Sequence, residues 1–318
     1  MRRTALIAVL FAGIGVAAPE QSTAERATAL AEHGNCADAM PLIHDALEQV
    51  AQIQDRDLKR RMGAAGVRCA MTLNHQGAAT LLLSWLEQEF PNDPEILFMA
   101  THVYSDLAAR TSQELMDAAP DSPLVVEINA EKFEKQGEWK KAIAEYRVLL
   151  AREPHMPGIH NRIGQIILAM PATATSSGEA RKEFEEELKV YPQNAGAEYF
   201  LGELDRKSGH LPQAIEHYRN ATRINPGLPE PHFGLGRCLL DSDRAADAVG
   251  PLETAARLQP GNPTVHLNLA HAYQELGRKE DAAREFALQK STSAKIQQNT
   301  ETVKRNVSGV PAPDSGGK

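Results

Sequence analysis

Residues 195–226 read AGAEYFLGELDRKSGHLPQAIEHYRNATRINP, and residues 263–289 read PTVHLNLAHAYQELGRKEDAAREFALQ. The two stretches share a period that runs through four alanines 34 residues apart, each four residues before a large side chain. A helix-turn-helix unit of this length cannot bury its apolar faces alone, so its copies are expected to stack. The sequence therefore predicts an all-α fold, an α-solenoid. The alanine and large-residue pairs are Ala180 with Phe184, Ala214 with Tyr218, Ala248 with Leu252, and Ala282 with Phe286.

The first stretch indicates how such a unit packs. Small residues at Gly202 and Ala214 allow two paired helices to approach closely, Tyr218 fills the space beside them, and Pro226 ends the second helix. With Gly209 in the turn, this pattern resembles the tetratricopeptide repeat family. The resemblance implies a right-handed superhelix that binds a protein or peptide along a concave surface lined by the first helix of each pair.

The repeats become less regular toward the N-terminus. The step from Ala142 to Ala180 is 38 residues, and we expect the extra residues to form a loop within MPATATSSGEA, residues 170–180. Between Pro91 and Pro120 only 29 residues remain, which predicts a short second helix at 111–119. We expect about eight helix pairs. The predicted divisions are a signal peptide at 1–24, degenerate helix pairs at 25–120, regular repeats with a capping helix at 121–298, and a disordered tail at 299–318.

The N-terminus has the layout of a secretory signal peptide. Arg2 and Arg3 precede an apolar run at residues 5–16, and small residues follow. Ala17 and Ala24 are the candidate cleavage positions, and an uncleaved membrane anchor is the alternative. We therefore expect an exported bacterial protein, periplasmic or secreted, with no integral membrane span after cleavage.

An oxidising compartment would permit a disulfide between two of the three cysteines. Cys36 falls at the start of one predicted helix and Cys69 near the end of the next, and consecutive antiparallel helices bring such positions level. A Cys36–Cys69 bond is therefore reasonable, and two buried free thiols are the alternative. Cys238 is expected to be an inert core residue.

Catalytic and metal-binding motifs are missing from the sequence, so we expect no enzyme activity, no metal and no cofactor. His160, His232 and His266 recur at one repeat position, which indicates packing. Carboxylates such as Glu185 and Glu187 are expected to form a solvated helix face. A net charge of −8 makes nucleic acid an unlikely type of partner.

The family resemblance implies that first-helix residues line the binding groove. Aromatic and arginine side chains among polar ones suit a binding surface, and ordinary packing between repeats is the alternative for each residue. The groove positions are Phe98, His102, Glu127, Glu131, Asn161, Gln165, Tyr199, Glu203, Arg206, Phe233, Arg237, Leu267 and His271.

Two functions are consistent with these features. The first is a non-catalytic scaffold or adaptor of the cell envelope, or a secreted one, that holds a protein or peptide in its groove. The alternative is an accessory component of polysaccharide export or carbohydrate handling. The sequence does not indicate an oligomeric state.

Overall fold

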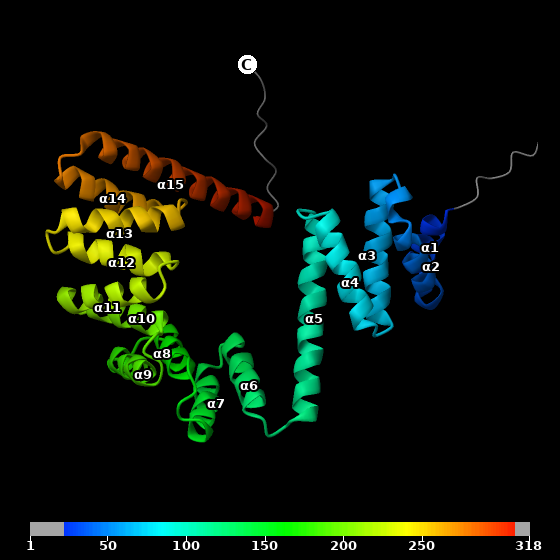
Figure 1. Cartoon of the computed structure of the whole chain (residues 1–318), viewed down its shortest axis with the longest axis horizontal. Helices are drawn as coiled ribbons and strands as arrows, with labels where there is room; N and C mark the ends of the chain where they lie inside the picture. Colours follow the sequence, from blue (N-terminus) through cyan, green and yellow to red (C-terminus); the bar gives the residue numbers. More distant parts are fainter. Residues whose placement is uncertain (1–21, 309–318) are drawn as a thin grey trace, which may run out of the picture. The chain divides into compact units, whose positions relative to one another are not determined.

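The computed structural model describes residues 22–308, and in that range the chain folds into fifteen α-helices and one short 3-10 helix without strands (Figure 1). The helices divide into two compact units, Met1–Pro120 and Asp121–Lys318. Each unit is described by itself below. The α-solenoid of helical repeats expected from the sequence is confirmed, and its right-handed sense stays a prediction.

The first unit contains two helix pairs followed by a single long helix. The first helix of each pair packs against its own partner, and α1 also packs against α3. The bounds are α1 (Thr23–Glu32), α2 (Cys36–Glu48), η1 (Val50–Gln52), α3 (Arg56–Thr72), α4 (Gln76–Glu89) and α5 (Pro94–Ala118).

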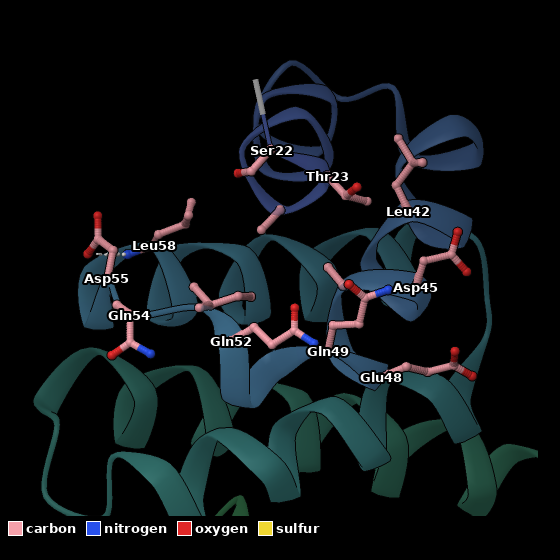
Figure 2. A pocket seen from close by; sticks show the side chains of 13 residues that line it. Ser22, Thr23, Leu42, Asp45, Glu48, Gln49, Gln52, Gln54, Asp55 and Leu58 are labelled. Atoms are coloured by element: carbon pink, nitrogen blue, oxygen red, sulfur yellow. Dashed lines mark hydrogen bonds between the residues drawn. The ribbon is translucent and has the colours of Figure 1, made fainter. Parts of the chain in front are cut away.

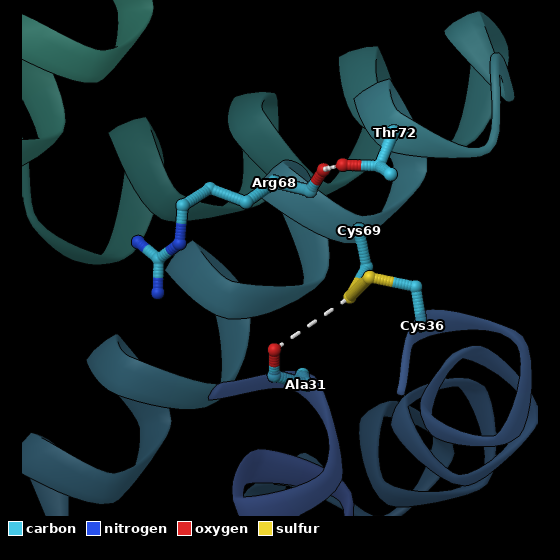
Figure 3. The surroundings of a disulfide bond; sticks show 5 residues. All are labelled: Ala31, Cys36, Arg68, Cys69 and Thr72. Carbon is cyan, nitrogen blue, oxygen red and sulfur yellow. Dashed lines mark hydrogen bonds between the residues drawn. A yellow bond between two sulfur atoms is a disulfide. The ribbon is translucent and has the colours of Figure 1, made fainter. Parts of the chain in front are cut away.

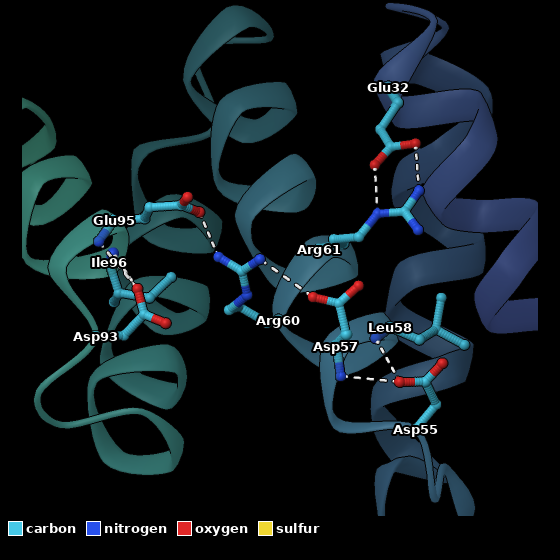
Figure 4. Close-up of polar contacts among 9 residues, drawn as sticks. All are labelled: Glu32, Asp55, Asp57, Leu58, Arg60, Arg61, Asp93, Glu95 and Ile96. Carbon is cyan, nitrogen blue, oxygen red and sulfur yellow. Dashed lines mark hydrogen bonds and ion pairs between the residues drawn. The ribbon is translucent and has the colours of Figure 1, made fainter.

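Side-chain caps fix where three of these helices begin. The Ser22 hydroxyl accepts a hydrogen bond from the Glu25 backbone N–H, and the Glu25 carboxylate accepts one from the Ser22 N–H. Asp55 and Asp93 cap α3 and α5 by accepting hydrogen bonds from two backbone N–H groups each (Figure 4). Such caps satisfy N–H groups that have no partner within the helix and stabilise each start by about 1 kcal/mol.

Arginines on α3 connect the successive first helices of this unit. The guanidinium of Arg61 donates two hydrogen bonds to Glu32 of α1, at 3.0 and 2.8 Å, and Arg60 bonds to Asp57 and to Glu95 of α5 (Figure 4). The hydrogen bond from Arg61 lowers the pKa of Glu32. These pairs are exposed to solvent, so they fix orientation more than they add stability.

The Cys36–Cys69 disulfide is present, as the first of the two alternatives predicted, and it joins the start of α2 to the end of α3 (Figure 3). Its Cα atoms lie 5.0 Å apart, a normal separation for a disulfide. The Sγ atom of Cys69 lies 3.9 Å from the carbonyl oxygen of Ala31. Because a disulfide sulfur carries no proton, this approach is a contact and not a hydrogen bond.

The short second helix expected at 111–119 does not exist. Residues 94–118 form one continuous helix, α5, so the first unit has two pairs and a single helix where three pairs were expected. The prediction was wrong because the stretch 104–118 has no glycine or proline to end a helix, and pairs such as Asp106 with Arg110 support its continuation. No residue in that stretch is buried.

The second unit contains five consecutive helix pairs, stacked in chain order (Figure 1). The second helix of each pair packs against the first helix of the next. The bounds are α6 (Pro123–Lys135), α7 (Trp139–Arg152), α8 (Ile159–Ala169), α9 (Ser176–Val190), α10 (Ala195–Lys207), α11 (Leu211–Ile224), α12 (Pro229–Leu240), α13 (Ala245–Leu258), α14 (Pro263–Glu275) and α15 (Lys279–Ser308). Residues 170–175 form the predicted loop between α8 and α9.

The periodic residues lie at the helix crossings of this unit. Ala180, Ala214 and Ala248 are fully buried, and Ala282 is nearly so. The ring of Tyr218 lies between two glycines, because a Cβ atom added at Gly202 or at Gly234 would come within 2.9 or 2.6 Å of it. These separations are too short for any side chain, so both positions require glycine while the tyrosine is present.

Two predicted boundaries need correction. The predicted signal-peptide boundary at 24 lies inside α1, whose cap is Ser22 and whose Ala24 is buried. Of the two candidate cleavage positions, only the one after Ala17 would leave this helix intact, and cleavage itself stays a prediction. The predicted disordered tail was wrong for residues 299–308, because α15 continues to Ser308 and no glycine or proline interrupts it before Gly309. Residues 1–21 and 309–318 lie outside the described residues.

Candidate protein-binding surface

The first helices of successive pairs adjoin one another in the second unit. α10 contacts α12, and α12 contacts α14. Their side chains therefore form a continuous surface, named here the first-helix surface. The residues predicted for it in this part of the unit are Tyr199, Glu203, Arg206, Phe233, Arg237, Leu267 and His271.

Three of these residues form one polar and aromatic cluster on α10. Arg206 donates a hydrogen bond to Glu203 at 2.9 Å, and Glu203 accepts another from the Tyr218 hydroxyl at 2.5 Å. The ring centroid of Tyr199 lies 5.1 Å from that of Phe200 and 6.2 Å from that of Tyr218. The structure thus brings the predicted α10 residues together, with Tyr218 of α11 as their shared partner.

Burial changes the protonation behaviour of this cluster. It raises the pKa of Tyr199 to about 12 and that of Tyr218 further still. Burial also opposes ionisation of Glu203, but the hydrogen bonds from Arg206 and Tyr218 outweigh it and lower the pKa of that carboxyl. Glu203 and Arg206 are therefore a charged pair at neutral pH.

The remaining predicted residues differ in how much of each side chain is exposed for contact with a partner. Phe233 and Tyr199 are half-buried and pack against the core, which is the packing role given above as the alternative. Leu267 is also half-buried. Arg237 and His271 are exposed, and the His271 ring meets Phe286 edge-on at 5.7 Å between centroids.

The predicted residues on α6 and α8 are half-buried. Glu127, Glu131 and Gln165 belong to this group, as does Asn161, whose Oδ1 atom is buried without a hydrogen-bond partner. Asn161 lies against Gly196 of the next first helix, so it belongs to the contact between repeats.

Phe98 and His102 lie on α5 of the first unit. Their ring centroids are 4.3 Å apart, and 68% of Phe98 is exposed. They form an exposed aromatic pair within that unit.

Glu187 was expected on a solvated helix face, and this was wrong. Its carboxylate is fully buried and accepts hydrogen bonds from the backbone N–H groups of Gly158 and Asn161, at 2.7 and 3.2 Å, and from the Asn194 amide at 2.8 Å. It therefore caps the start of α8 from the neighbouring helix α9. The spacing from Ala180 and Phe184 places Glu187 on the buried stripe, a signal present in the sequence.

The recurring histidines join helices within and between pairs. His160 bonds to Glu183 and His266 to Glu285, both at 2.7 Å, which connects the first helix of a pair to its second. His266 also reaches the carbonyl of Pro260, and His232 that of Pro226, in the loops that precede their helices. The packing role predicted for this position is thus a hydrogen-bonding one.

In the helix pair α10 and α11 the histidine and the glutamate exchange places, with the glutamate on the first helix and the histidine on the second. Glu198 occupies the histidine position, and its Oε2 lies 2.6 Å from Nδ1 of His217. The other ring nitrogen of His217 lies 3.6 Å from the buried Asp205, which also binds Arg181 of α9 at 2.5 Å. This network was missed because its members come from three helices.

The network makes stability depend on pH. The hydrogen bond to Glu198 raises the pKa of His217, with Asp205 adding to it and burial and Arg181 opposing it. The stabilisation is therefore complete below the unfolded pKa, about 6.5, and is lost as the pH rises through the folded value.

We expect His217→Gln to lower the free energy of unfolding by about 1.5 to 3 kcal/mol near pH 6, and by less near pH 9. Urea unfolding at both pH values measures this, with the exposed His44→Gln as the control. An equal loss at both pH values would contradict a charged His217.

One cavity of the first unit is lined by residues that the sequence did not predict as part of a site. In the first unit a cavity of about 750 Å³ lies where α1 begins and α2 ends, with Asp45, Glu48 and Asp55 in its lining (Figure 2). The carboxylate of Asp55 is engaged as the cap of α3.

In the second unit Cys238 is free and fully buried, and burial raises its pKa to about 11, so it is an unreactive thiol. Among the described residues, no cluster of three or more metal-ligating side chains occurs.

Residues 202–242 match the family described as the TPR repeat. They span α10 from Gly202 through α12, where the periodic alanine and the two glycines around Tyr218 lie. This stretch is a TPR repeat.

Similarity to curated proteins is confined to a short stretch. The chain is 40% identical over 63 residues to the probable biofilm formation methyltransferase WspC of Pseudomonas putida, covering 20% of this chain and 15% of that protein. It is 38% identical over 63 residues to the protein CTR9 homolog of Arabidopsis thaliana, covering 20% and 6%. The chain thus spans less than a sixth of the length of the curated relatives it matches.

Solved structures of TPR proteins align with a larger part of the chain. The crystal structure of YrrB, a TPR protein with an unusual peptide-binding site, shares 17% identity and covers 61% of this chain and 97% of its own, with a TM-score of 0.48. MamA from Desulfovibrio magneticus RS-1 shares 15% identity and covers 55% and 97%, with a TM-score of 0.48.

Proposed function

We propose that this protein is a non-catalytic scaffold that binds a protein or peptide on the first-helix surface of its second unit. The carrying observation is that α10, α12 and α14 adjoin one another and present aromatic and arginine side chains on neighbouring turns. Side chains of these types provide large contact area and geometrically specific hydrogen bonds at protein interfaces. Of the two functions considered from the sequence, protein binding has this support.

The geometry assigns different tasks to the residues of this surface. Tyr199, Glu203 and Arg206 hold one another in place, so they offer a pre-formed contact that loses little conformational entropy on binding. Arg237 and His271 are exposed and free to meet a partner directly. An acidic or aromatic segment would complement Arg237 and the rings beside it.

Exposed residues provide the test of this surface, because alanine at Tyr199 or Phe233 would also disturb the core. We expect the double variant Arg237→Glu with His271→Glu to weaken partner capture about tenfold or more without changing the unfolding temperature. The measurement is a cross-linking pull-down from the source cells, followed by titration of the captured protein. Arg219→Glu on α11 is the control for the arginine of this pair, since it makes the same charge change as Arg237→Glu on an exposed second-helix position.

Equal capture by the double variant and the wild type would contradict binding on this surface. Retention of a glycan with no protein partner would favour the carbohydrate-handling alternative. Catalytic turnover by the purified protein would contradict a purely binding role.

We further propose that the protein is exported and works in the periplasm or outside the cell. The disulfide supports this, because such bonds persist in oxidising compartments. Among residues 22–308, none of the helices combines the length and apolar character needed to cross a bilayer. We expect N-terminal sequencing of protein recovered outside the cytoplasm to start before Ser22, since that cap must remain. Full-length protein confined to the cytoplasm with reduced cysteines would contradict export.

A further inference from the structure

An apolar groove of the first unit lies between α2 and α4, which are the second helices of its two helix pairs. It has a volume of about 800 Å³, and Leu81 at its edge is 74% exposed. We name it the α2–α4 groove, and its lining consists of Ala37, Met40, Pro41, Ile43, His44, Leu47, Glu48, Leu73, His75, Ala78, Leu81 and Leu82.

The surroundings of this groove are acidic. Neither α2 nor α4 contains a lysine or arginine, whereas Asp38, Asp45 and Glu48 are exposed on α2. Of these three, Glu48 lines the groove itself, and Asp45 lines the neighbouring cavity drawn in Figure 2. Pro41 also has no N–H to donate, so the carbonyl of Ala37 lacks its usual helical partner, and both residues line the groove. An apolar segment with positive charge and hydrogen-bond donors would fit these features.

The last helix of the chain has the complementary character. Beyond Ser293 the side chains of α15 are exposed as far as Lys304. Leu288, Ile296 and Val303 are 44%, 50% and 60% exposed and fall within one stripe of the helix, since their spacings of eight and seven residues are near whole turns. Lys295 borders this stripe, and Lys290 and Lys304 add positive charge elsewhere on the helix surface.

We propose that the α2–α4 groove of one molecule binds the exposed stripe of α15 from a second copy of this chain. The stripe from 288 to 303 is about 22 Å long and the α2 wall from 37 to 48 is about 17 Å long, so the stripe can span the whole length of the groove. Apolar side chains would fill the groove, and Lys295 would approach Glu48, the one carboxylate in its lining. An amphipathic helix laid in an apolar groove is a common mode of recognition.

The interface is heterologous, because groove and stripe are different surfaces. Any open assembly therefore keeps one free groove at one end and one free stripe at the other, and association continues head to tail. Groove-to-groove pairing would instead bring like charges together. This inference is independent of the proposed function, since neither Arg237 nor His271 takes part.

Complementation of two variants tests the proposal. Leu81→Gln removes the apolar edge of the groove, and Ile296→Glu disrupts the stripe, both at exposed positions that leave the fold intact. Sedimentation and light scattering should show concentration-dependent association of the wild-type chain that weakens with added salt. Each variant alone should associate about tenfold or more weakly, and an equal mixture should form a species of twice the mass of one chain and nothing larger.

Two exposed apolar residues outside the interface provide matched controls. Leu97→Gln on α5 and Val148→Gln on α7 should associate as the wild type does. A wild-type chain that stays monomeric at all accessible concentrations would overturn the proposal. So would variants that associate unchanged, or a mixture that fails to complement. Loss of partner capture by Arg237→Glu with unchanged self-association would separate the two proposals.

Discussion

Replacing Tyr218 with alanine is expected to lower the free energy of unfolding of the second unit by about 3 to 5 kcal/mol. The ring is fully buried and is held between Gly202 and Gly234, which belong to successive first helices. Its removal leaves a cavity that two backbones cannot easily close, because glycine has no side chain to move into it. Urea unfolding followed by circular dichroism measures the loss.

Two further substitutions separate the contributions of Tyr218. Tyr218→Phe keeps the ring and removes the hydroxyl that donates to Glu203, so we expect a smaller loss of about 1 to 3 kcal/mol. Tyr191→Ala, at a position that is 44% exposed, should change stability by about 0.5 kcal/mol or less. A loss from Tyr218→Ala no larger than that from Tyr191→Ala would contradict the role of this ring at the crossing.

Reduction of the Cys36–Cys69 disulfide is expected to lower the stability of the first unit by about 3 to 4 kcal/mol. The two cysteines are 33 residues apart, and the bond restricts the unfolded chain over that loop. Thermal unfolding with and without dithiothreitol measures the effect, which should appear as a lower unfolding temperature of this unit alone.

The double variant Cys36→Ser with Cys69→Ser is the control for the reductant. It should unfold at the lower temperature in either condition, because Cys238 is a free buried thiol that the reductant does not change. Sensitivity of this variant to dithiothreitol, or insensitivity of the wild type, would contradict the assigned bond.

The 34-residue period predicted the helix crossings well because it reports packing directly. Alanine and glycine recur where helix backbones approach each other. A large side chain recurs where the gap between them must be filled, as Tyr218 does between Gly202 and Gly234. The disulfide could also be predicted, since antiparallel helices set which ends lie level. The period says less about where helices stop.

Features that depend on helix ends or on several helices were missed. α5 and α15 extend further than predicted because loss of the repeat pattern does not itself end a helix, and neither stretch contains glycine or proline. The network around His217 joins three helices, so no local pattern marks it. Glu187 was visible on the buried stripe but was interpreted from its charge alone.

The first-helix surface was predicted in part. The second-unit residues named from the family resemblance do lie on first helices, and their role in binding stays a prediction. Burial divides them into those that hold the repeats together and those that are exposed. Asn161 and Phe233 belong to the first group, and Arg237 and His271 belong to the second. Only the packing of neighbouring repeats reveals this division.

Site-specific photo-cross-linking tests the central claim most directly. A photoreactive amino acid placed at Arg237 on α12 should form a covalent adduct with the partner in source cells, and the same group at Arg219 on α11 should form none. Adducts formed equally from both positions, or only from Arg219, would contradict binding on the first-helix surface.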